Sequence, residues 1–129
     1  MSEKTNPLKD KSFAFTIRCI NLYKNLVETK REFVLSKQLL RSGTSVGANI
    51  REAQNAQSKA DFIHKLSISQ KECDESLYWL ELLKAPYFIS ENEFQSVYSE
   101  ATELLKMLRN AIITSKKVTH NSKLLIQNS

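Results

Sequence analysis

The scarcity of residues that break secondary structure constrains this chain more than any other feature. Its 129 residues include only two glycines and two prolines, whereas β-sandwiches, β-barrels and βα units need turn residues at nearly every connection. So few breakers predict few turns and long elements. Because a chain of this length falls within the usual range for one domain, we expect one domain with a single core.

Apolar side chains recur at intervals of three and four residues, which places them on one face of an α-helix. In one segment Leu39, Val46 and Ile50 follow this spacing, and in another Phe94 and Val97 do so. No segment alternates with a period of two over a useful length. The pattern predicts four helices, at residues 8–29, 32–57, 59–85 and 91–117.

Several helix ends carry their own signals. Asn6 precedes Pro7, and Ser58 and Ser90 are each followed three residues later by an acidic residue. These patterns are typical of helix N-caps, in which a side-chain oxygen accepts a backbone N–H that the helix leaves unpaired. Pro86 ends the third helix because it has no N–H to donate.

The connections between the predicted helices are short, which makes consecutive helices antiparallel neighbours. The sequence therefore predicts an all-α fold, an antiparallel up-down-up-down four-helix bundle over residues 1–117. In residues 118–129 polar side chains dilute the apolar pattern, and we expect a disordered tail there.

The net charge of +5 is unevenly distributed. Residues 1–60 hold eleven Lys or Arg against five Asp or Glu, and residues 61–115 hold five against nine. Residues 116–129 add three lysines and no acidic residue. A basic half can attract nucleic-acid phosphates, or it can face the acidic half of a second subunit in head-to-tail assembly. A solvated surface with clustered charges is the third interpretation.

The second predicted helix is unusual because Gly43 and Gly47 lie in its middle. Each glycine costs about 1 kcal/mol relative to alanine, so we expect a compensating interaction. Close packing inside the bundle, contact with a neighbouring subunit and a flexible kink are three explanations that the sequence leaves open.

A polar row runs beside the apolar face of this helix, through Ser42, Ser45, Asn49 and Glu52. A hairpin that turns near residue 57 brings positions at equal distances from the turn together, which predicts that Glu52 pairs with Lys65 and Arg41 with Glu72. The favoured interpretation is a structural polar network that fixes helix register. A chemical role for a carboxylate and a role between subunits are the alternatives.

Basic residues of the first two predicted helices and of the connection between them form the candidate nucleic-acid interface. They are Arg18, Lys24, Lys30, Arg31, Lys37, Arg41 and Arg51. Aromatic residues for base stacking are not interleaved with the basic residues of the second helix, which favours nonspecific or shape-based contact over reading of single strands.

The chain has no pattern typical of an active site. Only Asp61 and His64 show the spacing of a di-metal carboxylate motif, and the other histidine, His120, lies in the tail. Cys19 and Cys73 occupy apolar positions on different helices, and we expect them to be buried, reduced thiols. The sequence predicts no metal site and no cofactor.

Three stretches of the sequence resemble a known family. The runs RSGTSVGANIREA, ADFIHKLSIS and KECDESLYWLELL are similar to the 23S-rRNA intervening-sequence protein family, and the resemblance covers residues 10–117. It implies an antiparallel four-helix bundle and a ring-forming homopentamer, with no catalytic residues. A related branch is the accessory protein of diversity-generating retroelements, a basic bundle that binds nucleic acid and a reverse transcriptase.

Together these features predict a non-enzymatic, cytoplasmic protein that forms a homo-oligomer, with a pentameric ring favoured, and binds RNA or DNA through a basic surface. The alternative is a protein-interaction module, such as a partner of a reverse transcriptase, without direct nucleic-acid contact. A metal-dependent oxidoreductase is a third hypothesis and would require bound iron or manganese. No apolar run approaches the roughly 18 residues of a membrane span, and the polar N-terminus does not resemble a signal peptide.

Overall fold

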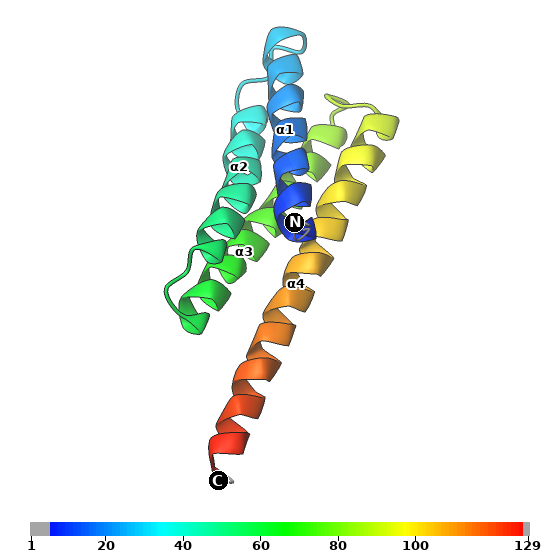
Figure 1. Ribbon diagram of the computed structural model, residues 1–129. Coiled ribbons are helices and arrows are strands. Elements are labelled where there is room, and N and C mark those ends of the chain that lie inside the picture. Colours follow the sequence, from blue (N-terminus) through cyan, green and yellow to red (C-terminus); the bar gives the residue numbers. More distant parts are fainter. Residues whose placement is uncertain (1–5, 128–129) are drawn as a thin grey trace, which may run out of the picture.

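The computed structural model describes the backbone of residues 6–127 and the side chains of residues 6–118. Its elements are four helices, α1 (Pro7–Glu28), α2 (Leu35–Gln54), α3 (Lys59–Lys84) and α4 (Glu91–Gln127). Successive helices run in opposite directions (Figure 1). Each helix packs against two others, in the cyclic order α1, α2, α3, α4. The predicted all-α, up-down-up-down four-helix bundle is therefore confirmed.

Three of the predicted N-caps are present. The side chain of Asn6 accepts the Lys9 N–H at 3.1 Å at the start of α1. The Ser58 hydroxyl accepts the backbone N–H of the residue three positions later at 3.0 Å. The Ser90 hydroxyl likewise accepts the Glu93 N–H at 3.1 Å. These bonds satisfy N–H groups for which the helix itself has no acceptor.

The start of α2 differs from the prediction, because the helix begins at Leu35 and not near residue 32. The Glu32 carboxylate lies just before it and accepts the N–H groups of Val34, Leu35 and Ser36 at 3.0, 2.8 and 2.7 Å. Burial raises the pKa of Glu32, but these backbone hydrogen bonds outweigh burial, and the net pKa lies below its usual value. The sequence does not predict this cap, because glutamate is not among the preferred N-cap residues.

The end of α4 also differs from the prediction. The helix continues through Gln127, well beyond the expected end near Lys117. No glycine or proline follows Pro86, and residues such as Thr, Asn and Ser disfavour a helix only mildly. Most of the segment for which a disordered tail is expected, residues 118–129, thus lies within α4, and residues 128–129 lie outside the described residues.

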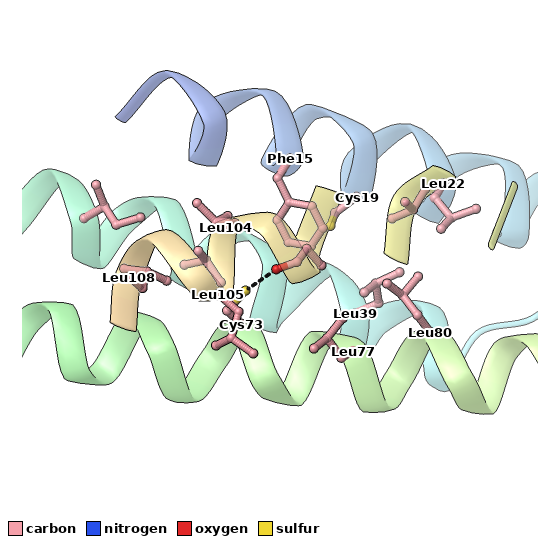
Figure 2. Packing of buried hydrophobic residues seen from close by; sticks show 14 of the residues in the cluster. Phe15, Cys19, Leu22, Leu39, Cys73, Leu77, Leu80, Leu104, Leu105 and Leu108 are labelled. Carbon is pink, nitrogen blue, oxygen red and sulfur yellow. Dashed lines mark hydrogen bonds between the residues drawn. The ribbon is translucent and has the colours of Figure 1, made fainter. Parts of the chain in front are cut away.

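The core lies between the four helices, and each helix contributes apolar side chains to it (Figure 2). Among them, Phe15 and Cys19 come from α1 and Leu39 from α2, while α3 supplies Cys73 and α4 supplies Leu104. Both cysteines are free and fully buried. The Cys73 thiol donates to the carbonyl of Ala101 at 3.3 Å. Burial raises the pKa of each thiol to about 12, so both remain protonated at neutral pH.

The two glycines of α2 face α1 within the subunit. A Cβ on Gly43 would lie 2.5 Å from the Cys19 Sγ, and a Cβ on Gly47 would lie 3.0 Å from the Thr16 Oγ1. The Thr16 hydroxyl also lies 3.3 Å from the carbonyl oxygen of Gly43, within hydrogen-bond distance. Of the three explanations for these glycines, the structure therefore supports close helix packing inside the bundle.

Candidate functional site

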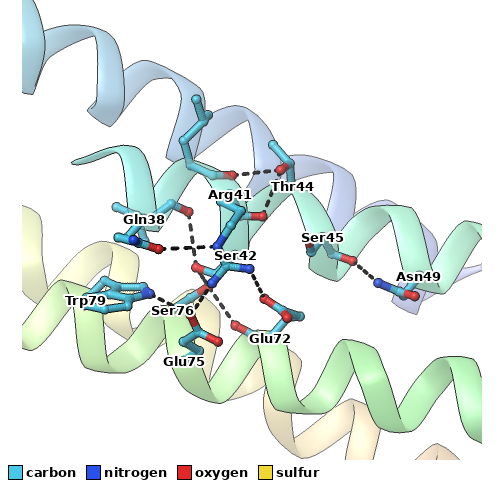
Figure 3. A network of polar contacts seen from close by, with 12 residues as sticks. Gln38, Arg41, Ser42, Thr44, Ser45, Asn49, Glu72, Glu75, Ser76 and Trp79 are labelled. Carbon is cyan, nitrogen blue, oxygen red and sulfur yellow. Dashed lines mark hydrogen bonds and ion pairs between the residues drawn. The ribbon is translucent and has the colours of Figure 1, made fainter. Parts of the chain in front are cut away.

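The best-connected polar site joins α2 to α3 around Arg41 (Figure 3). The guanidinium donates to Glu72 at 3.0 Å and also to Glu75, and its Nε donates to Gln38 at 3.3 Å. The Trp79 indole N–H donates to the same Glu75 carboxylate at 3.2 Å. The predicted Arg41–Glu72 pair is confirmed. Glu75 lies one helical turn from Glu72, and the two glutamates reach the same guanidinium because i, i+3 positions share a helix face.

Buried serines bridge the same two helices. The Ser42 and Ser76 hydroxyls lie 2.7 Å apart, and Ser76 donates to the carbonyl of Glu72 at 2.9 Å. Ser69 of α3 donates to the carbonyl of Val46 of α2 at 2.8 Å. All three serines are fully buried. Their small side chains allow α2 and α3 to approach closely while every hydroxyl keeps a partner, as buried polar groups require.

The second predicted ion pair closes the other end of the hairpin. Lys65 lies 3.0 Å from the Glu52 carboxylate. Glu52, through this hydrogen bond and its charge, raises the pKa of Lys65 above its usual value. Asn49, by contrast, donates to the carbonyl of Ser45 in its own helix at 2.8 Å. The polar side chains between α2 and α3 therefore form two separate ion-pair sites, one around Arg41 and one at Glu52.

Two of the seven basic candidates are neutralised within the subunit. Arg18 of α1 donates to Glu100 at 2.8 Å and to Ser96 at 2.9 Å, and so connects α1 to α4. Arg41 is held by the two glutamates of α3. These pairs reduce the positive charge that either guanidinium offers to a phosphate.

The other five basic candidates are exposed and lie in two places. Four of them, Lys24, Lys30, Arg31 and Lys37, surround the connection between α1 and α2, at one end of the bundle (Figure 1). Arg51 lies near the other end of α2. Four of the exposed basic candidates therefore form a cluster at one end of the bundle, and Arg51 lies apart from them.

A groove of about 440 Å³ lies between the outer sides of α1 and α2. Phe13, Gly47 and Ala48 are among its lining residues, together with the basic side chains of Lys9 and Arg51. Phe13 is 68% exposed, which is unusual for a large apolar side chain. The glycine at 47 contributes no side chain that would fill the groove.

The comparison with known proteins identifies the family of this helical bundle. A family model described as "23S rRNA-intervening sequence protein" matches residues 4–110. The chain belongs to the 23S rRNA-intervening sequence protein family. It is also similar to a crystal structure described as a protein with unknown function from the S23 ribosomal protein family of Bacteroides thetaiotaomicron VPI-5482. That match has 54% sequence identity and a TM-score of 0.81, and it covers 81% of this chain and 97% of the other. No curated protein matches the chain.

In this member of the 23S rRNA-intervening sequence family, the motif that carried the resemblance forms the α2–α3 interface. The run of residues 41–53 lies in α2, and the two following runs lie in α3. The three runs therefore contain Arg41, Ser42 and Glu52 of α2 together with the α3 residues that pair with them. The motif's combination of small, polar and apolar residues follows from close packing with paired polar groups.

Neither the family description nor that of the structural neighbour names a reaction. Within the described part of this family member, no three His, Cys, Asp or Glu side chains gather as a metal ion would require. No helix over those residues has the length and apolar character needed to cross a membrane.

Proposed function

We propose that this protein is a non-enzymatic helical bundle that assembles into a homo-oligomeric ring, with a pentamer favoured, and offers a basic surface to RNA or DNA in the cytoplasm. The observation that supports it most is the arrangement of charge and exposed apolar surface on the two helix pairs. Excess positive charge lies in residues 1–60, which include α1 and α2. Excess negative charge lies in residues 61–115, which include most of α3 and the part of α4 before its last lysines.

The assembly proposal pairs two different surfaces. The α1–α2 groove combines the exposed Phe13 ring with the cations Lys9 and Arg51. On the outer side of α3, Tyr78 is 54% exposed, and the exposed carboxylates of Asp74 and Glu81 lie one turn before and one turn after it. In this contact the Tyr78 side chain of one subunit lies in the groove of the next, and the cations of the groove face the carboxylates of α3. Because the contact joins two different surfaces, its repetition can close into a cyclic oligomer.

Analytical ultracentrifugation at micromolar concentrations tests the assembly. We expect a wild-type mass several times that of the 14.8 kDa chain, and a lower mass for Phe13→Glu and for Tyr78→Glu. Val34→Glu is the control, because Val34 is 71% exposed and lies outside both surfaces. Arg51→Glu should weaken the assembly, and Asp74→Arg in the same chain should restore it. A monomeric wild-type protein would refute the ring.

The nucleic-acid proposal depends on the cluster of Lys24, Lys30, Arg31 and Lys37. Cations that neutralise phosphates release counterions, so affinity must fall steeply with salt. Fluorescence anisotropy with labelled RNA and DNA at low and moderate salt tests this. Lys30→Glu and Lys37→Glu should weaken binding, while Lys71→Glu, an exposed cation of α3, should not. Absence of binding to every RNA and DNA tried at low salt would overturn the proposal.

The groove between α1 and α2 also favours a second candidate, a protein-interaction module. An amphipathic helix with acidic flanks, for example from a reverse transcriptase, would complement the apolar floor and the two cations of the groove. In that case Phe13→Glu would abolish co-purification with the partner. Co-purification that survives nuclease treatment, together with unaltered nucleic-acid affinity, would favour this candidate over the first.

A further inference from the structure

The two connections α1–α2 and α3–α4 meet at the same end of the bundle. A hollow of about 390 Å³ lies between them. Asn25 and Lys30 line it from one side, and Lys84, Tyr87 and Phe88 line it from the other. Residues that are far apart in the sequence therefore form one surface, which we call the loop end.

Tyr87 occupies a position where glycine is the usual residue. Its N–H donates to the carbonyl of Lys84 at 2.9 Å, and the next N–H, from Phe88, donates to Leu83 at 3.0 Å. These two bonds form a Schellman motif with Tyr87 at its left-handed position, where its φ is 65°. A side chain in this conformation is strained. The Tyr87 ring is 88% exposed, so burial of the ring does not offset that strain.

The α1–α2 connection contributes a second exposed ring with a cation beside it. Phe33 is 51% exposed, and the Arg31 guanidinium lies 5.3 Å from the centre of its ring. Arg31 is the other non-glycine residue with a positive φ among the described residues, at 56°. Two strained positions and two exposed rings therefore occur at the same end of the bundle.

The charges of the loop end are asymmetric. Lys24, Lys30 and Lys37 are exposed on the α1–α2 side. On the α3–α4 side, Lys84 is paired with Glu91 at 3.1 Å, so its charge is neutralised. A polyanion would therefore place its phosphates along the α1–α2 side. The exposed rings of Phe33 and Tyr87 then offer stacking surfaces to the bases that the phosphate backbone carries.

We infer that the loop end binds unpaired RNA or DNA, with bases stacked on Tyr87 and Phe33 and phosphates held by the lysines of the α1–α2 side. Exposed aromatic rings beside cations are the arrangement that recognises single strands, because stacking requires a free base face. A duplex has no free base face except at its ends. This inference rests on the proposed nucleic-acid function and specifies its ligand.

The Tyr87→Gly variant distinguishes base stacking on Tyr87 from a purely structural role of this residue. Tyr87→Gly relieves the backbone strain, so we expect a higher midpoint of urea unfolding. It also removes a stacking surface, so we expect affinity for a labelled twelve-nucleotide oligouridine to fall about tenfold. Tyr87→Phe should bind like the wild type, because the ring is retained. Ile113→Ala is the control and should leave oligouridine affinity unchanged, because Ile113 is 50% exposed and lies on α4, outside the loop end and both assembly surfaces.

Duplex RNA of the same length distinguishes the inference from the proposed function. Lys30→Glu should weaken binding to both ligands, whereas Tyr87→Gly should weaken binding to the single strand alone. Wild-type protein that binds neither ligand would refute the proposed function. Binding to both ligands, with oligouridine affinity unchanged by Tyr87→Gly, would overturn the stacking inference and leave the proposed function intact.

Discussion

Substitution of alanine for Gly43 should destabilise the bundle, although alanine is the better helix former. The added Cβ would lie 2.5 Å from the Cys19 Sγ and 3.0 Å from the Cys19 Cβ. Carbon atoms in favourable contact lie about 3.5–4.0 Å apart. Cys19 is fully buried, and a close-packed core has few voids into which its thiol could move.

The expected magnitude is a difference between two opposing effects. Alanine gains about 1 kcal/mol in helix propensity over glycine. Overpacking in a core costs about 1–3 kcal/mol, and a contact of 2.5 Å belongs at the upper end of that range. The net loss in the free energy of unfolding is therefore about 2 kcal/mol. For a domain of this size the Tm would fall by about 8 °C.

Urea unfolding followed by far-UV circular dichroism and by the fluorescence of Trp79 measures this loss. All variants need the same protein concentration, because assembly would raise the apparent stability. Gly47→Ala is the matched control: its Cβ would lie 3.0 Å from the hydroxyl of Thr16, a half-buried side chain that can rotate. We expect a change within about 0.5 kcal/mol for this variant. A Gly43→Ala protein about 1 kcal/mol more stable than the wild type would refute the close approach of α1 and α2.

Two further predictions concern titratable groups. Glu32→Gln should destabilise the protein by about 1 kcal/mol at pH 7, because it weakens the cap of α2. The pKa of Glu32 is lowered in the folded state, so its stabilising effect is present above the unfolded pKa and is lost as the pH falls through the folded value. The difference from wild type should therefore vanish in acid, and a difference that is constant from pH 7 to pH 3 would contradict this. Burial raises the pKa of Cys19 and Cys73 to about 12, so neither thiol should react with an aromatic disulfide reagent at pH 8 until urea unfolds the protein. Rapid reaction of either thiol in the folded protein would show that it is accessible.

The sequence alone predicted the features that depend on neighbours within one segment or across a short turn. Apolar spacing identified the four helices, and Asn6, Ser58 and Ser90 marked three of their starts. The α2–α3 pairs were also predictable, because a short connection fixes which positions face each other. Arg41–Glu72 and Glu52–Lys65 both follow from that register.

Only the tertiary structure decided the features that depend on helices meeting from distant parts of the chain. It showed that Gly43 faces Cys19 of α1 and that Arg18 reaches Glu100 of α4. It also brought the loop carrying Lys30 and the loop carrying Tyr87 to one hollow. The periodicity of apolar residues specifies which face of each helix is buried. It does not specify which helix covers that face, because any apolar helix face can pack against another. That choice depends on how all four helices pack at once, and it determines where the exposed rings and cations of this protein gather.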